Sequence, residues 1–467
     1  MLFTEPIFFA FFALVFVLHW ALPGHRARKL LLLVASYTFY AGWDSRFLLL
    51  ILASTIIDFV IARGMDAAEG TARKRWLLAS LTANLGLLGF FKYFNFFIES
   101  ANSLFELAGI DLGLRTFGII LPVGISFYTF QTMSYSIDVY RRQLRPIHDF
   151  WDFALFVGFF PQLVMGPILR ARTFLPQLTV RQRWKDIPVQ SLLALFAVGF
   201  IKKACVSDNI APLVDGVYGD LGTYDMLSVC TAVLYYAVQL YCDFSGYTDM
   251  AIAVAGLLGY QVALNFDFPL LASNVTEFWR RWHISFSSWL RDYLYFPLGG
   301  SRRGPVRTDV NLMITMLLSG LWHGAGLNFI TWGGLNGVAL IAHRVYRTHL
   351  HPPAPVRALF AATGWLLTVW WFAFTLIFFR SQTLAEALEV CRSFVLFESA
   401  GERALSPWTL IWFAPLLLAH LVARRVDVRA LAARTPGPVF AAVLGILTGL
   451  ALGFVRTDYR PFIYFQF

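Results

Sequence analysis

Apolar segments of about 16 to 22 residues recur along the chain and alternate with short polar loops, and about 20 apolar residues suffice for a helix to cross a bilayer. This alternation predicts about a dozen membrane-spanning helices. The predicted spans cover residues 7–22, 30–41, 47–62, 76–98, 117–137, 188–205, 226–242, 310–326, 328–346, 357–379, 406–423 and 438–455. The pattern therefore predicts an all-α integral membrane protein.

One apolar segment, residues 150–169, breaks the alternation of the loops. It contains Pro161 and Pro167 and is flanked by arginines at both ends. Proline removes a backbone donor and kinks a helix, and irregular backbone at membrane depth is tolerated only beside protein or a water-filled cavity. We expect a re-entrant segment that lines a cavity.

A second unusual stretch, residues 241–249, places Asp243 and Asp249 between apolar runs. We expect an irregular segment that lines the same cavity, where the two carboxylates orient bound groups. Helix capping or a solvated loop end would account for the carboxylates equally well.

The segment from residue 276 to residue 296 mixes basic and aromatic residues, among them Trp279, Arg280 and Arg281. This mixture is typical of a helix that lies at the membrane interface. The arginines then serve either as snorkelling anchors or as groups that also bind phosphates.

The composition supports the membrane interpretation. Of 467 residues, 58% are hydrophobic and only 14% are charged, which excludes a soluble globular protein of this length. The net charge of +10 lies in short loops, a distribution that indicates orientation in a membrane and argues against nucleic-acid binding. Because the basic loops share one side when the first span runs outside to inside, the positive-inside rule predicts that both termini face away from the cytoplasm.

No internal repeat or soluble linker is evident, so we expect a single polytopic domain over residues 1–467. The four cysteines show no CxxC spacing. We therefore expect neither a metal cluster nor a disulfide. We also expect no bound cofactor.

Two of the nine histidines stand in unusual surroundings. His283 lies in the motif EFWRRWHIS, and His323 follows an apolar run and precedes glycines that let backbone or ligand approach closely. An ionisable group inside a membrane is costly and usually functional, although a packed, hydrogen-bonded core histidine is the alternative. Both histidines are candidate catalytic residues.

A desolvated neutral imidazole can accept a proton from an alcohol in the transition state, which is worth about 10² to 10⁴ in rate. Such general-base catalysis suits acyl transfer from a thioester to a hydroxyl. The chain has no GxSxG motif to present a nucleophilic serine. Direct transfer without an acyl-enzyme intermediate is therefore the simpler hypothesis.

In its longer motifs the chain resembles the membrane-bound O-acyltransferases, in particular the bacterial branch with the alginate O-acetyltransferase membrane subunit and the teichoic acid D-alanyl transfer protein. The matching motifs are residues 31–37 (LLLVASY), 121–128 (LPVGISFY), 160–167 (FPQLVMGP), 239–249, 276–300 and 320–324 (GLWHG). Residues 278–285 and 290–300 look most like the alginate acetylation branch, which favours acetyl over D-alanyl cargo. Gln162 departs from that branch, where the position is often histidine, and the acceptor polymer stays open.

The resemblance implies a ring of about 11 to 13 transmembrane or re-entrant helices around a central tunnel, with the family core over about residues 117–380. It implies a bacterial cytoplasmic (inner) membrane location, with His323 as the essential histidine and His283 as a second functional position. It also implies an acyl thioester donor, for which we expect acetyl-CoA, and a periplasmic or surface SGNH-type partner that completes transfer to a polysaccharide. The expected substrate-binding residues are Arg280, Arg281, Trp279, Asp243, Asp249 and Gln162.

Three alternatives remain open at this stage. The first is D-alanyl transfer to teichoic acid from a carrier-protein thioester. The second, from another functional class, is a polysaccharide or acyl-group transporter in which the histidines form a proton relay. The third is a structural scaffold of an export complex, in which His323 would be freely replaceable.

Overall fold

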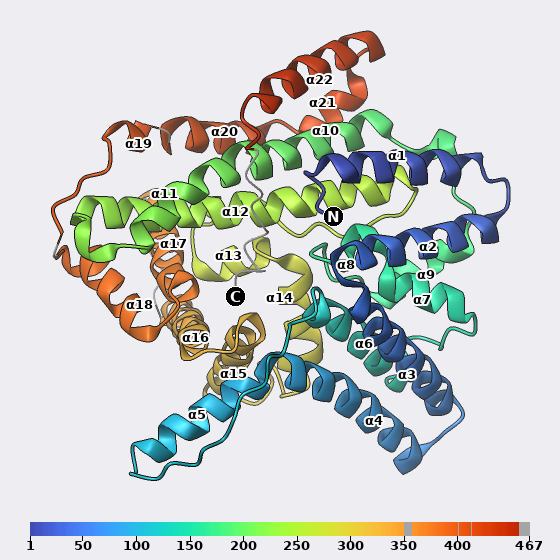
Figure 1. Cartoon of the computed structure of the whole chain (residues 1–467), viewed down its shortest axis with the longest axis horizontal. Coiled ribbons are helices and arrows are strands. Elements are labelled where there is room, and N and C mark those ends of the chain that lie inside the picture. Colours follow the sequence, from blue (N-terminus) through green and yellow to red (C-terminus); the bar gives the residue numbers. More distant parts are fainter. Residues whose placement is uncertain (350–356, 400, 412, 457–467) are drawn as a thin grey trace. The chain divides into compact units, whose positions relative to one another are not determined.

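The computed structural model describes residues 1–349, 357–399, 401–411 and 413–456. The regular structure of these residues is helical, apart from one isolated bridge between Tyr224 and Arg403 (Figure 1). The prediction of an all-α protein is thereby confirmed for the described part of the chain.

Five helical stretches of the described chain are long and apolar enough to cross a membrane, or up to six if one bent pair, Trp408–Arg425 with Val428–Arg434, forms a single span. These five are His25–Asp66, Gly70–Glu106, Val189–Tyr218, Met226–Leu257 and Leu359–Arg380. The number is lower than the dozen expected for three reasons. The predicted spans 30–41 and 47–62 merge into one stretch, and those at 7–22, 117–137 and 438–455 form helices of only 16 residues. The helices that cover 310–326 and 328–346 are long enough but not apolar enough. Several long apolar helices remain, and the chain is a multi-pass membrane protein.

The chain divides into two compact units, which are described separately. The first comprises residues 1–187 and 254–263. Its helices are α1 (Pro6–Ala21), α2 (His25–Asp44), α3 (Leu48–Asp66), α4 (Gly70–Leu88), α5 (Phe94–Glu106), α6 (Ile125–Tyr140), α7 (Phe150–Gly158), α8 (Phe160–Leu163) and α9 (Ala171–Thr179). The expectation of a single domain over residues 1–467 stays a prediction.

The predicted span over residues 117–137 is wrong in its first third, because α6 begins only at Ile125. Pro122 lacks a backbone N–H group, and Gly124 adopts a left-handed conformation with φ of 76°. A Cβ atom on Gly124 would lie 2.7 Å from the backbone oxygen of Leu163, so the chain can make this close approach only with glycine.

The proline-containing segment at residues 150–169 is interrupted, as predicted. α7 ends at Gly158, α8 begins at Phe160 and ends at Leu163, and nearly all side chains of the two helices are buried. Its re-entrant course in the membrane stays a prediction.

A buried polar cluster joins α3, α4 and α6 within the first unit. The carboxylate of Asp58 accepts hydrogen bonds from the hydroxyl of Ser80 (2.6 Å), the amide of Asn84 (2.8 Å) and the hydroxyl of Ser136 (3.2 Å). Because a buried carboxylate is costly without donors, these three bonds fix the rotation of the three helices about one point.

The second unit comprises residues 188–253 and the chain from Leu264 onward. It contains most of α12 (Met226–Leu257), and its other helices are α10 (Val189–Phe200), α11 (Asp208–Tyr218), α13 (Val275–Arg281), α14 (Ile284–Leu290), α15 (Pro305–His323), α16 (Leu327–His349), α17 (Arg357–Arg380), α18 (Leu384–Cys391), α19 (Trp408–Ile411), α20 (Phe413–Arg425), α21 (Val428–Arg434) and α22 (Gly437–Leu452). A π-helical turn, Ile201–Ser207, joins α10 to α11.

The helices α15 and α16 form a hairpin whose crossing is built from glycines. A Cβ atom on Gly320 would lie 2.1 Å from the backbone oxygen of Phe329, and one on Gly333 would lie 2.3 Å from that of Met316. The two backbones therefore approach each other as closely as in small-residue crossings of membrane helices. The turn of the hairpin follows directly after His323.

Candidate active site

The segment over residues 276–296 is not the single interfacial helix that the sequence predicted. It forms α13 and α14, which are separated at Trp282 and His283, and it ends in a π-helical turn from Arg291 to Tyr295. The backbone of His283 is left-handed, with φ of 43° and ψ of 53°, a conformation that strains a residue with a Cβ atom. The segment's aromatic side chains are buried within the second unit, namely Phe278, Trp282, Phe286 and Trp289.

His323 ends α15 and lies among aromatic rings. It is 5% exposed, and the ring centroids of Trp332, Phe379 and Phe286 lie 5.0, 5.2 and 5.4 Å from that of its imidazole. The next residue is Gly324, where an added Cβ atom would overlap the ring of Phe329. The rings of Trp332, Phe379 and Phe286, which we call the aromatic box, therefore hold the imidazole at the helix end.

His283 lies close to His323 in the second unit. Its imidazole is 1% exposed and packs on Phe286 at 5.0 Å, the same ring that contacts His323. Trp322 also contacts both imidazoles, at 6.3 and 4.9 Å. The two histidines thus share a pair of aromatic neighbours although 39 residues separate them in the sequence.

The polar contacts of His283 come from a loop that precedes α13. Its Nδ1 atom lies 3.2 Å from the Oδ1 atom of Asn265, and its Nε2 atom is buried with no hydrogen-bond partner among the described residues. Burial lowers the pKa of His283 from its ordinary value of 6.5 to about 3. The imidazole is therefore neutral at physiological pH.

The three predicted substrate-binding residues on α13 differ in their surroundings. Arg281 forms an ion pair with Glu277 at 2.5 Å, one turn earlier on the helix. Arg280 is exposed, and the described chain offers it no ion pair. Trp279 packs on Trp332 at 5.8 Å and so extends the aromatic box around His323. Of the two arginines, Arg280 is the one whose guanidinium is open to a phosphate.

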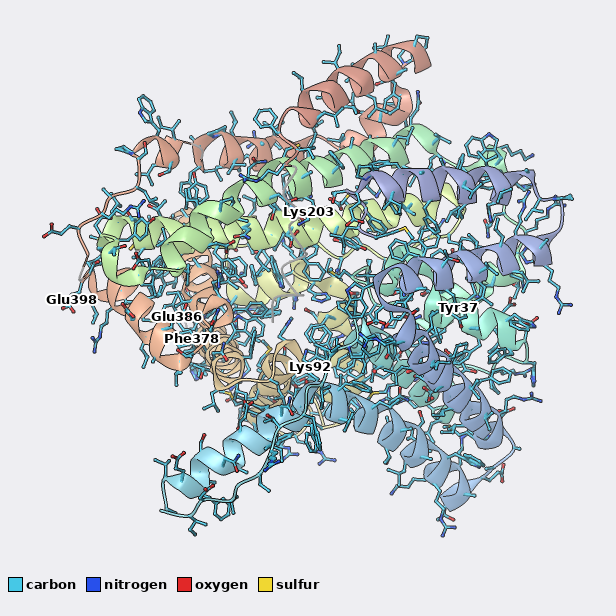
Figure 2. All side chains as sticks on the ribbon, in the orientation of Figure 1. Tyr37, Lys92, Lys203, Phe378, Glu386 and Glu398 are labelled. Carbon is cyan, nitrogen blue, oxygen red and sulfur yellow. The ribbon has the colours of Figure 1, made fainter. Side chains whose placement is uncertain are left out.

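The stretch over residues 241–249 is regular helix, which corrects the expectation of an irregular segment and also the alternatives of a cap or a loop end. Asp243 and Asp249 lie inside α12 and bind lysines of the π-helical turn. Lys203 bridges Asp243 and Asp208 at 2.7 Å each, and Lys202 binds Asp249 at 2.7 Å. The position of Lys203 is labelled in Figure 2. Because the carboxylates are neutralised, the helix can continue through them.

Gln162, the remaining predicted site residue, lies in α8 of the first unit. Its side chain is 1% exposed and donates a hydrogen bond to Oε1 of Gln131 at 2.9 Å. Gln131 in turn donates to the backbone oxygen of Phe156. In the first unit Gln162 thus belongs to a chain of buried amides that connects α6, α7 and α8.

Sequence reasoning missed Lys202, Lys203, Asn265 and Phe286 as parts of the second unit's polar and aromatic framework. A signal was present for the lysines, since two adjacent ammonium groups at the end of a predicted span require partners. Asn265 carries no such signal, because its role depends on a contact with α14 that only the tertiary structure creates. In the described part of the chain, no group of three His, Cys, Asp or Glu side chains is placed to hold a metal ion.

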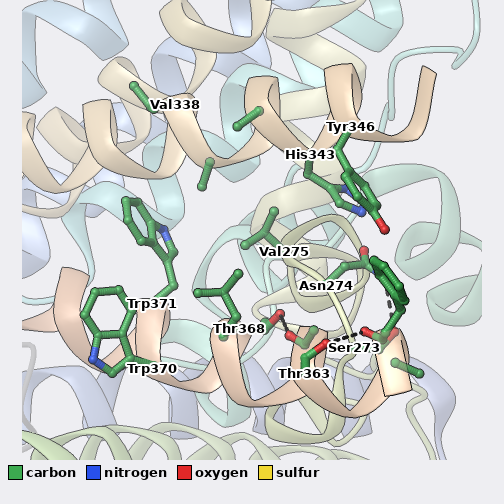
Figure 3. Close-up of a pocket in the computed structure, with 16 residues that line it drawn as sticks. Ser273, Asn274, Val275, Val338, His343, Tyr346, Thr363, Thr368, Trp370 and Trp371 are labelled. Atoms are coloured by element: carbon green, nitrogen blue, oxygen red, sulfur yellow. Dashed lines mark hydrogen bonds between the residues drawn. The ribbon is translucent and has the colours of Figure 1, made fainter. Parts of the chain in front are cut away.

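A separate cavity of about 720 Å³ lies between α16, α17 and the start of α13 (Figure 3). Ser273, Asn274, His343 and Tyr346 line its polar end, and Trp370 and Trp371 line the other end (Figure 3). None of the predicted site residues lines it. A hydrogen bond of 2.7 Å between Thr276 and His343 connects this cavity to α13.

Comparison with known proteins adds independent findings. Residues 139–381 match the model of the MBOAT, membrane-bound O-acyltransferase family. The chain is 38% identical to a probable alginate O-acetylase from Pseudomonas aeruginosa over 90% of its own length and 80% of that protein. It is 34% identical to a peptidoglycan O-acetyltransferase from Helicobacter pylori over 85% and 80% of the two chains. A teichoic acid D-alanyltransferase from Bacillus subtilis is 26% identical over 49% of this chain and 60% of that protein.

Proposed function

The chain belongs to the membrane-bound O-acyltransferase family, and on that premise we propose that it moves an acetyl group from acetyl-CoA to a hydroxyl of an exported cell-surface polysaccharide. Transfer to the polymer is either direct or completed by a periplasmic SGNH-type partner. Membership of a family of acyltransferases sets aside the transporter and scaffold alternatives. The observation that carries the proposal is the packing of two buried imidazoles, His283 and His323, against one ring, Phe286.

In the proposed reaction His323 is the general base. Its imidazole accepts the proton of the acceptor hydroxyl while the hydroxyl oxygen bonds to the thioester carbonyl carbon. The carbon–sulfur bond then breaks, and the CoA thiolate takes that proton from the imidazolium. The surrounding rings of Trp332, Phe379 and Phe286 keep water from the thioester, so that hydrolysis does not compete.

We assign the donor side of the site to α13. Arg280 is exposed there and binds a phosphate of CoA, whereas Arg281 is held by Glu277 and fixes the helix end. In this proposal the donor enters from the cytoplasm, and the protein lies in the inner membrane with both termini outside the cytoplasm. The distribution of basic loops supports this orientation.

The relatives support acetyl over D-alanyl cargo. Two relatives named for O-acetylation match 85–90% of this chain at 34–38% identity, whereas the D-alanyltransferase matches 49% of it at 26%. The alternative remains testable, because D-alanyl transfer requires a carrier-protein thioester. Co-purification with a small carrier protein, together with no activity on acetyl-CoA, would reject the acetyl assignment.

The test is the release of free CoA by the purified protein in lipid nanodiscs, with its partner and a polysaccharide acceptor supplied. His323→Ala should lower the rate by about 10² to 10⁴, because it removes the proton acceptor. His349→Ala is the matched control, since His349 is an exposed histidine at the far end of α16. Normal acetylation by His323→Ala, at wild-type protein levels, would remove His323 from the mechanism.

A further inference from the structure

One oxygen atom of Asn265 accepts three hydrogen bonds. The backbone N–H group of Ser285 donates to Oδ1 at 3.1 Å, the hydroxyl of Ser285 donates at 2.9 Å, and Nδ1 of His283 lies at 3.2 Å. The backbone N–H group can only donate, so the atom that faces it must be the amide oxygen. Exchanging the oxygen and nitrogen of this amide would set donor against donor, which fixes the orientation of Asn265.

This orientation determines where the proton of His283 resides. Because Oδ1 can only accept, Nδ1 of His283 must carry the hydrogen. A neutral imidazole has one N–H group, so Nε2 carries a lone pair. The rings packed on the imidazole are Phe244, Phe266, Phe286 and Trp322, and none of them titrates.

We propose that Asn265 is a positioning residue that holds His283 as the Nδ1–H tautomer, so that Nε2 acts only as an acceptor in the site. This inference rests on the proposed function and assigns different roles to His283 and His323 within it. Nε2 accepts a hydrogen bond from an O–H or N–H group of a bound substrate and cannot give a proton to the leaving thiolate. That proton therefore comes from His323.

The backbone around His283 shows that Asn265 also holds the strained residue in place. Besides the side-chain contacts, the N–H group of Ile284 donates to the backbone oxygen of Asn265 at 2.9 Å. The side chain of Asn265 thus occupies the place of an N-cap for α14, whose own N-cap residue, His283, makes no side-chain cap bond. A test must separate this capping role from control of the tautomer.

The direct test is ¹⁵N NMR of the full-length protein in nanodiscs with labelled histidines, since the nitrogen shifts distinguish protonated from unprotonated ring nitrogens. The difference from His283→Gln isolates the signals of His283. We expect a protonated Nδ1 and an unprotonated Nε2. Because the pKa of about 3 lies below this range, the ring gains no proton between pH 8 and pH 5. A proton on Nε2 in the wild-type protein would overturn the proposal whether or not the protein transfers acetyl groups.

Three variants then test the part played by Asn265. Asn265→Asp keeps an acceptor oxygen and should keep the Nδ1–H signal, whereas Asn265→Leu removes the acceptor and should make the Nε2–H tautomer appear. Ser285→Ala removes the hydroxyl bond but retains the contact with His283, so the signal should not change. If Asn265→Leu folds and the tautomer of His283 is unchanged, the role of Asn265 is overturned. If Asn265→Leu does not fold, loss of the Nδ1–H signal in Asn265→Asp would overturn that role.

Kinetics distinguish positioning from loss of structure. Asn265→Leu should lower kcat at least about tenfold, with a smaller change in the KM for acetyl-CoA. Partners that orient a metal-bound imidazole contribute about 10-fold to 100-fold, and an imidazole that binds substrate depends on its orientation in the same way. Asn311→Leu is the matched control: Asn311 is also fully buried, but its amide donates to the backbone oxygen of Gly300. Equal effects of both substitutions on kcat and thermal stability would show a merely structural role and contradict the proposal.

Discussion

Two neighbouring arginines of the candidate site differ in whether a carboxylate neutralises their charge. Arg280 and Arg281 are neighbours on α13, yet Glu277 neutralises only Arg281. An exposed guanidinium without a carboxylate partner is free to bind an anion bidentately. The two arginines should therefore respond differently to substitution.

We expect Arg280→Ala to raise the KM for acetyl-CoA about tenfold with little change in kcat. A phosphate contact remote from the reacting carbon stabilises the bound substrate and the transition state equally. The effect should shrink as ionic strength rises, since exposed charges are screened by salt. Steady-state kinetics at low and high salt measure this. The matched variant Arg281→Ala should mainly lower the melting temperature, and an unchanged KM in Arg280→Ala would place the donor elsewhere.

Among the elements, the α15–α16 hairpin depends on two glycines at its crossing. We expect Gly333→Ala to destabilise the protein by about 1–3 kcal/mol, because the added methyl group overpacks a close backbone contact. Activity should fall with it, since the neighbouring Trp332 lines the aromatic box of His323. Thermal melting in detergent measures the loss.

The next residue provides the control for this prediction. A Cβ atom on Gly334 would meet only a methyl group of Leu317, at 3.5 Å, which is an ordinary contact. Gly334→Ala should therefore leave the melting temperature unchanged or raise it slightly, as alanine favours helix over glycine by about 1 kcal/mol. Equal melting temperatures for the two variants would contradict the close crossing.

Ion pairs join the π-helical turn (Ile201–Ser207) to α12, and their lysines differ in how far they are exposed to solvent. Lys203 is 3% exposed and bridges two carboxylates, whereas Lys202 is 26% exposed and binds one. We expect Lys203→Met to cost about 3–5 kcal/mol, because it removes the ammonium that neutralises a buried carboxylate. Urea or thermal unfolding in detergent should show a smaller loss for Lys202→Met. Adding Asp243→Asn to Lys203→Met should restore part of the stability, and no recovery would contradict the buried pairing.

For the whole molecule, the distribution of charge predicts the orientation in the membrane. Alkaline phosphatase fused after Asp220, in an acidic loop, should be active because it is exported. The same enzyme fused after Arg303, in a basic loop, should be inactive because it stays in the cytoplasm. Activity in colonies grown on a chromogenic phosphatase substrate measures the outcome. The opposite pattern would invert the proposed topology and the side from which the donor enters.

Much of the helical architecture could be predicted from the sequence because apolar segments of membrane length carry a direct physical signal. His283 and His323 could also be singled out, since an imidazole in such surroundings is costly. The late start of α6 follows from Pro122 and Gly124, whose local effect the hydrophobic pattern hides. The helical course through Asp243 could not be predicted without its partner Lys203, and the role of Asn265 depends on a contact between a loop and α14. Local patterns thus give the elements, whereas the pairing of polar groups requires the tertiary structure.

The glycine crossing of α15 and α16 has a consequence for biogenesis. Its contacts join residues that are close in the sequence, such as Met316 with Gly333 and Gly320 with Phe329. Local contacts form quickly because little loop entropy is lost in closing them. The hairpin can therefore pair while the ribosome is still adding the C-terminal helices. His323 then packs against Trp332 before Phe379, another of its aromatic neighbours, has been synthesised.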